Sequence, residues 1–90
     1  MPTHAQQFFV FVKCAVGQTY PVGRRILKDV PYVKEVFSVS GRWDLLVRIA
    51  LDSREDVGEL VNAKLAGVGG IADTETIVAY PVFDREDVFF

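Results

Sequence analysis

Two spacings of hydrophobic residues alternate along the chain, one with a period of two and one typical of a helix. Residues 8–16 (FFVFVKCAV) are rich in Val and Phe and too short for a free-standing helix, so they predict a strand that ends at Gly17. Both faces of this strand are apolar, with Lys13 as the exception, so we expect both to be covered. One face carries Phe8, Val10, Val12, Cys14 and Val16, and the other carries Phe9, Phe11 and Ala15.

Two later segments show the apolar stripe of an amphipathic helix. The first covers residues 20–30, with Pro21 suited to the first helical turn. Its stripe consists of Val22, Ile26, Leu27 and Val30. The second follows Ser53, which together with Asp56 resembles a helix-start capping arrangement, and it ends before Gly67. Its stripe consists of Val57, Leu60, Val61 and Leu65.

A pair of strands is predicted between the two helices. Residues 32–40 (YVKEVFSVS) and 43–51 (WDLLVRIAL) both alternate, and a tight Gly-Arg turn separates them, which predicts an antiparallel hairpin. In the first strand, one face is expected to carry Val33, Phe37 and Val39, and the other Lys34, Val36, Ser38 and Ser40. In the second strand, the apolar face consists of Trp43, Leu45, Val47, Ile49 and Leu51.

The chain ends with a further strand and a tail. Residues 71–80 (IADTETIVAY) return to strand composition after a glycine-rich loop. One face carries Thr74, Thr76, Val78 and Tyr80, and the other carries Glu75, Ile77 and Ala79. The tail, residues 82–90, joins an acidic stretch to Phe89 and Phe90, which are costly to leave in water. We expect the tail to dock as a short extra strand on the same subunit or a neighbouring one.

The order strand, helix, strand, strand, helix, strand predicts an α+β fold, the ferredoxin-like βαββαβ arrangement. It consists of a four-stranded antiparallel sheet with both helices on one face. The length fits a single domain, residues 1–90, with a core over 7–81 and a tail over 82–90. The other face of the sheet would be bare and apolar, which isolated monomers seldom show. We therefore expect a second copy to pack on it, sheet to sheet, as a homodimer.

Composition narrows the classes of function. The formal net charge is −2 and the pI about 5.2, so the chain lacks the basic surface that favours phosphate backbones, and direct nucleic-acid binding is not expected. One Cys and one His are too few for a metal site within one chain, and no cofactor is expected. No apolar run is long enough to cross a membrane and the start lacks a secretory signal, which predicts a cytoplasmic protein.

Polar and apolar chemistry concentrate on one tight turn, residues 38–44 (SVSGRWD). The turn can offer backbone N–H groups to a carboxylate, Asp44 can accept from an ammonium, and Trp43 supplies an apolar wall. These are the parts needed to bind a zwitterion. In the alternative interpretation, the glycine simply makes the turn and the aspartate caps it. Thr74 and Thr76 share one face of the last strand, where their hydroxyls either bond a ligand or serve only as strand formers.

These residues resemble the effector-binding domain of the leucine-responsive regulator (Lrp/AsnC) family. The likeness covers residues 8–80 and rests on GRWDLLVRIAL after a strand and on KLAGVGGIADTETIVAY at the end of the second helix. It implies a βαββαβ domain that dimerises through its sheets, builds rings of dimers and binds an amino acid between dimers. By position, the effector-binding residues would be Gly41, Arg42, Trp43, Asp44, Thr74 and Thr76.

The family's helix-turn-helix DNA-binding domain is not found in this sequence, which starts at Met1 just before the first strand. The resemblance therefore implies a stand-alone, non-catalytic sensor, a RAM domain. Such a sensor would modulate transcription through mixed assembly with full-length regulators of the family. Trp43 stands where the family commonly has Tyr or Phe, which bears on the size of the pocket and the choice of ligand.

Two other functions stay open at this point. Small dimeric ferredoxin-like α/β-barrel proteins include monooxygenases and isomerases that use a pocket between sheet and helices. Asp44 is the only acid of this chain that suits such catalysis, and it would need an apolar cavity beneath it. The third candidate is a purely structural adaptor, in which the tail and the bare sheet face only recruit other chains. An adaptor would respond to no small molecule.

Overall fold

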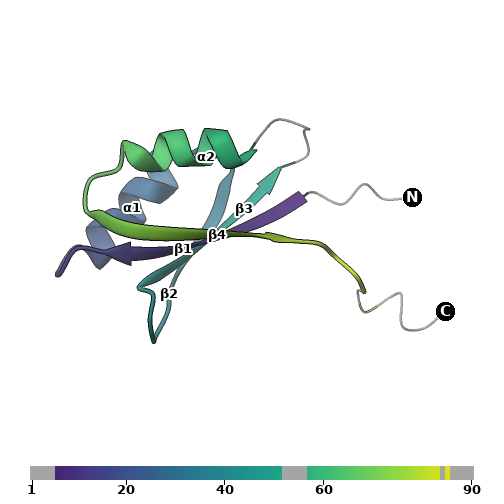
Figure 1. Cartoon of the computed structure of the whole chain (residues 1–90), viewed down its shortest axis with the longest axis horizontal. Coiled ribbons are helices and arrows are strands. Elements are labelled where there is room, and N and C mark those ends of the chain that lie inside the picture. The colour runs from purple at the N-terminus through teal and green to yellow at the C-terminus, as the bar shows by residue number, and fades with distance from the viewer. Residues whose placement is uncertain (1–5, 52–56, 84, 86–90) are drawn as a thin grey trace.

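The structure, a computed structural model, describes residues 6–51, 57–83 and 85 of the chain. Its elements are β1 (Gln6–Cys14), α1 (Thr19–Asp29), β2 (Val33–Ser38), β3 (Leu45–Leu51), α2 (Val57–Ala66) and β4 (Ile71–Ala79). Figure 1 shows their arrangement. The order is βαββαβ, so the predicted α+β fold class is confirmed.

The four strands form one antiparallel sheet in the order β2-β3-β1-β4. Both helices lie on the same side of this sheet (Figure 1). Strands β1 and β3 are therefore interior strands, which suits their long apolar runs, and β2 and β4 are the edges. The predicted ferredoxin-like layout, with two layers, is confirmed.

The helices bury one face of the sheet. The buried core consists of Phe8, Val10, Val12, Cys14, Val22, Ile26, Val30, Leu45, Val47, Ile49, Val61, Leu65 and Val68. The row of β1 from Phe8 to Cys14, predicted to share one face, therefore lies on the side of the helices. Val16, predicted to continue that row, is fully exposed, because β1 ends at Cys14 and the chain turns at Gly17 toward α1.

Strand β2 departs from the predicted alternation. Val33 pairs with Ile49, and the next core-side pair is Val36 with Val47, so β2 carries an extra residue between them. This bulge shifts the period-two alternation by one residue. Val33 and Val36 therefore both pack against the core, whereas Phe37 lies on the other face. The prediction that Val33 and Phe37 share a face, with Val36 opposite them, was wrong.

The connection between β2 and β3 is longer than the predicted tight turn. It covers residues 39–44, so Trp43 and Asp44 precede β3 instead of belonging to it. The backbone N–H of Asp44 donates to the carbonyl of Val12 at 3.0 Å, and the carbonyl of Asp44 accepts from the N–H of Val39 at 3.0 Å. The first bond holds the connection against β1, and the second closes the connection on itself.

Some predicted features lie outside the described residues. They are the capping pair Ser53 and Asp56 and the terminal Phe89 and Phe90. The second helix is described from Val57 onward, and Val61 and Leu65 of its predicted stripe are buried in the core. In the part of the chain that the structure describes, neither helix is long and apolar enough to span a membrane.

The side of the sheet away from the helices is uncovered in the single chain and carries large apolar residues together with the charged Glu35, Arg48 and Glu75. We call this side the open face, and its large apolar residues are Phe9, Phe11, Phe37, Leu46 and Ile77. Phe37 is 41% exposed and Ile77 44% exposed, while the other three are half-buried. The predicted bare apolar face is therefore present.

Gly70 fixes how the chain returns from α2 to the sheet. Its carbonyl accepts a hydrogen bond from the N–H of Ala15 at 2.7 Å, and its φ angle is +93°. A Cβ atom at this position would lie 2.8 Å from Cγ2 of Val22, which is closer than real contacts allow. The backbone angle and the close approach both require glycine.

We predict that Gly70→Ala lowers the free energy of unfolding by about 1–3 kcal/mol, because a left-handed backbone angle and a steric overlap are both imposed on the new side chain. Gly67→Ala is the matched control, since a Cβ there meets only the carbonyl of Lys64 at 3.5 Å. Urea denaturation of both variants gives the comparison. Equal losses in the two would contradict the role assigned to Gly70.

Candidate functional site

Asp44 holds the β2–β3 connection against the end of β1 through hydrogen bonds. Its carboxylate oxygen Oδ2 accepts a hydrogen bond from the backbone N–H of Cys14 at 2.8 Å and lies 3.7 Å from Nζ of Lys13. The pairing of β1 with β3 ends at Val12 and Leu45, so the N–H of Cys14 on that side of β1 has no ladder partner and needs another acceptor. Asp44 therefore has a structural role, and it fixes the position of the residues before it.

The hydrogen bond between Asp44 and Cys14 also positions Trp43, which extends the open face at the end of the sheet. Its ring centroid lies 5.9 Å from that of Phe11, with an angle of 32° between the rings. The guanidinium carbon of Arg42 lies 5.8 Å from the Trp43 ring centroid, within the range of a cation–π contact. Gly41, with a φ angle of +100°, makes the turn that precedes them.

These side chains border a small cleft, which we call the Trp43 cleft. Its volume is about 190 Å³, and it is lined by Lys13, Arg42, Trp43 and Asp73. Lys13 and Asp73 are cross-strand partners in the β1–β4 pairing, so one cation and one anion stand side by side at its base. The cleft therefore combines two cationic groups, one carboxylate and the indole of Trp43.

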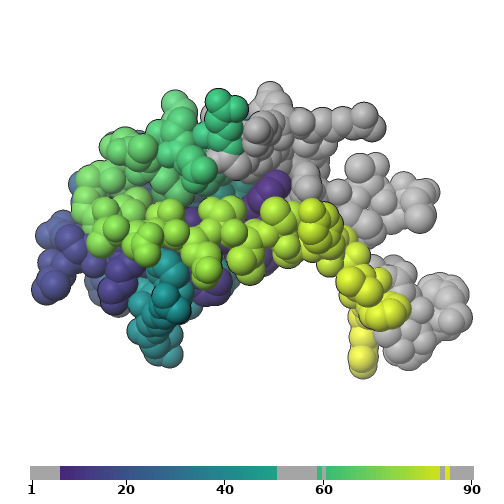
Figure 2. Space-filling model, viewed as in Figure 1, coloured from purple at the N-terminus to yellow at the C-terminus, as the bar shows by residue number. Residues whose placement is uncertain are grey.

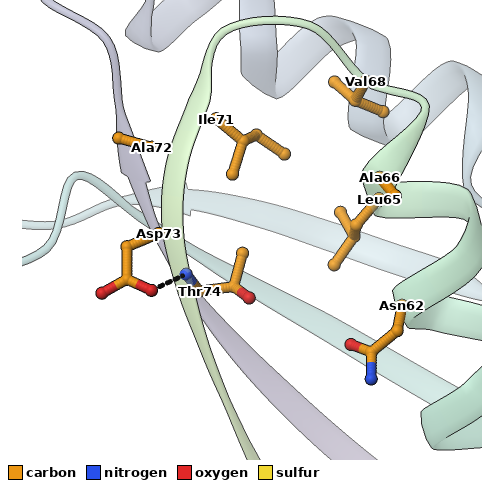
Figure 3. A pocket seen from close by; sticks show the side chains of 8 residues that line it. All are labelled: Asn62, Leu65, Ala66, Val68, Ile71, Ala72, Asp73 and Thr74. Carbon is orange, nitrogen blue, oxygen red and sulfur yellow. Dashed lines mark hydrogen bonds between the residues drawn. The ribbon is translucent and has the colours of Figure 1, made fainter.

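A second cavity lies between α2 and β4, and we call it the α2–β4 pocket (Figure 3). Its volume is about 300 Å³, and it is lined by Asn62, Leu65, Ala66, Val68, Ile71, Ala72, Asp73 and Thr74. Figure 3 shows Thr74 directed toward α2, while Asp73 projects from the other side of β4. One carboxylate oxygen of Asp73 accepts a hydrogen bond from the backbone N–H of Thr74 at 2.9 Å. Strand β4 thus separates this pocket from the Trp43 cleft.

The six residues predicted to bind one ligand are therefore divided in the single chain. Gly41, Arg42, Trp43 and Asp44 lie together in the β2–β3 connection, and two of them line the Trp43 cleft. Thr74 lines the α2–β4 pocket, and Thr76 is exposed further along the same strand. In the single chain the two groups therefore line different cavities, with Asp73 in the lining of both.

Sequence reasoning missed Lys13 and Asp73, which complete the Trp43 cleft. Lys13 did carry a signal, because it is the lone charge in an apolar strand. Asp73 carried none, since only the register of β1 against β4 brings it opposite Lys13. Among the described residues, no group of three or more His, Cys, Asp or Glu side chains is arranged to bind a metal ion.

Cys14 lies on the core side of β1, directly behind this site. Burial, followed by the negative charge of Asp44, raises the pKa of its thiol above the ordinary value. A hydrogen bond with Thr19 and the positive charge of Lys13 act in the opposite direction. The thiol is therefore kept neutral and unreactive, as expected for a buried cysteine that packs as a small hydrophobic residue.

Comparison with known proteins places these features in a family. The model of the Lrp/AsnC ligand-binding domain matches residues 7–88. An uncharacterized HTH-type transcriptional regulator from Pyrococcus abyssi is 35% identical over 65 residues, which are 72% of this chain and 43% of the regulator. This chain thus spans less than half the length of the curated relatives that it matches.

Solved structures show the same fold. TTHA0845 from Thermus thermophilus has a TM-score of 0.77 and 28% identity, over 89% of this chain and 99% of that one. A transcriptional regulator from Neisseria meningitidis, solved as a complex with L-Met, has a TM-score of 0.73 over 92% of this chain and 55% of that one. Its identity of 15% supports the likeness of fold alone.

We predict that Asp44→Asn lowers the pKa of the Cys14 thiol, because it removes a nearby negative charge and keeps an oxygen acceptor for the Cys14 N–H. A raised thiol pKa stabilises the wild-type fold below the pKa of the unfolded thiol, about 8.5, and this contribution is lost as the pH rises further. Thiolate absorbance followed against pH measures the shift. Asp29→Asn, on α1, is the control and should leave the titration unchanged.

Proposed function

Because this chain belongs to the Lrp/AsnC ligand-binding domain family, we propose that it senses a free amino acid that binds in the Trp43 cleft. The ligand-binding domains of transcriptional regulators have a sensing role, and this chain shares that role as a family member. The L-Met complex of the Neisseria meningitidis regulator supports an amino acid as the ligand class.

The observation that carries the proposal is the charge pattern of the Trp43 cleft. An α-amino acid presents a carboxylate and an ammonium on neighbouring atoms. Lys13 and Arg42 suit the carboxylate, and Asp73 suits the ammonium, all within a cavity of about 190 Å³. The indole of Trp43 then offers an apolar wall to the side chain of the ligand. A cleft with charges of one sign only would not select for a zwitterion.

We further propose that a second copy of this chain completes the site. The cleft lies at the end of the sheet where Lys13 pairs with Asp73, next to the open face, on which Phe37 and Ile77 are both more than 40% exposed. Packing of two open faces against each other would remove this apolar surface from water. It would also exclude water from the cleft, which strengthens each charge contact with a bound ligand.

In this proposal, regulation works through assembly. A ligand shifts an equilibrium between assemblies only when it binds one of them more tightly than the other. A site that lies at the edge of an interface between copies meets that condition, because its affinity depends on whether the partner is present. Mixed assembly with longer regulators of the family would pass the response to DNA. The net charge of −2 supports the absence of direct DNA binding by this chain.

We predict that one or a few of the twenty amino acids raise the melting temperature of the wild-type chain. Stabilisation should reach about 2.7 kcal/mol at a ligand concentration one hundred times the Kd. Asp73→Asn should weaken this binding by about 1 kcal/mol, because the ammonium loses its partner at a partly exposed site. A thermal-shift titration of both proteins with each amino acid provides the measurement.

Asp29→Asn is the matched control for this titration, since it neutralises an exposed carboxylate on α1 outside the cleft. It should respond to the same amino acids as the wild-type chain. If no amino acid shifts the melting temperature, the amino-acid proposal is wrong. If Asp73→Asn and Asp29→Asn respond alike, the ligand binds elsewhere than in the Trp43 cleft.

The sheet-to-sheet contact has a separate test. We predict that Phe37→Lys dissociates the dimer, because a charge would be buried against the partner's apolar face. Val16→Lys, which replaces a fully exposed residue outside the open face, should leave the dimer intact. Sedimentation velocity of both variants gives the masses. A dimer that survives Phe37→Lys would place the interface on another surface.

A further inference from the structure

The open face carries two charges that the proposed ligand site does not use. Arg48 lies on β3 directly opposite Phe9, and Glu75 lies on β4 directly opposite Phe11. Residues directly opposite each other on neighbouring strands share a face of the sheet, so both charged side chains belong to the same side as the two phenylalanines. They stand on either side of β1, the strand between them. A partner that covers Phe9 and Phe11 therefore covers both charges as well.

Arg48 keeps hydrogen-bonding capacity that its own chain does not use. Its Nε and Nη2 atoms both donate to a single oxygen, Oε1 of Glu35, at 2.9 and 2.6 Å. A guanidinium carries five N–H donors, so those that Glu35 does not engage are left for another acceptor. The side chain of Arg48 is 28% exposed, which lets water serve these donors in the single chain. A partner that removed this water would have to supply an acceptor in its place.

Glu75 carries the matching group, a carboxylate without a partner. Its side chain is exposed, and within the described residues it takes part in no hydrogen bond and no ion pair. Figure 2 shows β4, the strand that carries it, running uncovered along the surface of the domain. The neighbouring carboxylates on this face are engaged, since Glu35 pairs with Arg48 and Asp73 accepts from the N–H of Thr74. Glu75 is therefore available to a cation of another chain.

We infer that Arg48 of one copy pairs with Glu75 of a second copy, an inference that rests on the sheet-to-sheet contact proposed above. A two-fold axis along β1, between the packed sheets, places the β4 side of one copy over the β3 side of the other. Ile77 shares its row across the sheet with Arg48, and Glu75 lies two residues from it along β4, roughly 7 Å away. A long arginine side chain spans that step. By symmetry, the ion pair forms twice in each dimer.

These ion pairs decide which chain can occupy the open face. Apolar side chains such as Phe37 would pack against any apolar surface, whereas a like charge placed opposite Arg48 or Glu75 would repel the partner. The fitting partner has a basic residue at the position of Arg48 and an acidic one at the position of Glu75. A second copy of this chain meets both conditions. A longer regulator of the family would join a mixed assembly only if it carried the same two charges.

The test reverses each charge in a separate full chain. One variant carries Arg48→Glu and the other carries Glu75→Arg. A dimer of either variant alone would bring like charges together at both contacts, so its dissociation constant should rise at least about tenfold. Sedimentation velocity over a range of concentrations measures this constant. Glu35→Gln is the control, because it removes only the intrachain partner of Arg48, and it should dimerise as the wild-type chain does.

Mixing the two variants tests the pairing directly. In a mixed dimer, an acidic side chain meets a basic one at both contacts, so dimers should form again at the concentrations that suffice for wild type. The two variants differ in mass, and native mass spectrometry should therefore find mixed dimers almost alone. Recovery of the dimer in the mixture also shows that both variants are folded.

The outcomes separate this pairing from the contact on which it rests. The pairing is overturned if both variants dimerise as wild type does although Phe37→Lys dissociates the dimer. It is also overturned if the mixture contains mixed and unmixed dimers in statistical proportion. If the wild-type chain is a monomer, or if Phe37→Lys leaves the dimer intact, the sheet-to-sheet contact itself is wrong and the pairing of Arg48 with Glu75 falls with it.

Discussion

Strand β1 is apolar on both of its faces, and the arrangement of the whole domain follows from the need to cover both. An interior position, between β3 and β4, satisfies its backbone groups on both sides. The helices then cover the row that contains Val10 and Val12, which is fully buried. The row that contains Phe9 and Phe11 stays half-buried in one chain. One strand therefore contributes one row to the folded core and a second apolar row to the open face.

The candidate site is a consequence of how β1 ends. Beyond the last pair of β1 with β3, Val12 with Leu45, the N–H of Cys14 donates to the carboxylate of Asp44. That bond holds the β2–β3 connection against the sheet, so that Trp43 stacks near Phe11 beside the charged pair of Lys13 and Asp73. A residue predicted to touch the ligand thus acts here by positioning its neighbours.

The order of elements, the fold class and the two alternating rows of β1 could all be predicted, because each depends on spacing within single segments. The faces of β2 could not, since a bulge between Val33 and Val36 reverses the alternation and leaves no mark in the sequence. The role of Asp73 was also hidden, because it depends on register between strands far apart in sequence. Local pattern determines elements, while pairing between elements determines which side chains meet.

The bulge in β2 also bears on the solubility of the protein. An exposed, regular strand at the edge of a sheet can recruit the edges of other molecules without limit, which is the route to fibrils. In β2 the bulge breaks the regular edge at its first residues, where Lys34 and the Glu35–Arg48 ion pair add charge. Only a short regular stretch of this edge remains, from Val36 to Ser38. An edge that is short, bulged and charged disfavours continuous edge-to-edge stacking.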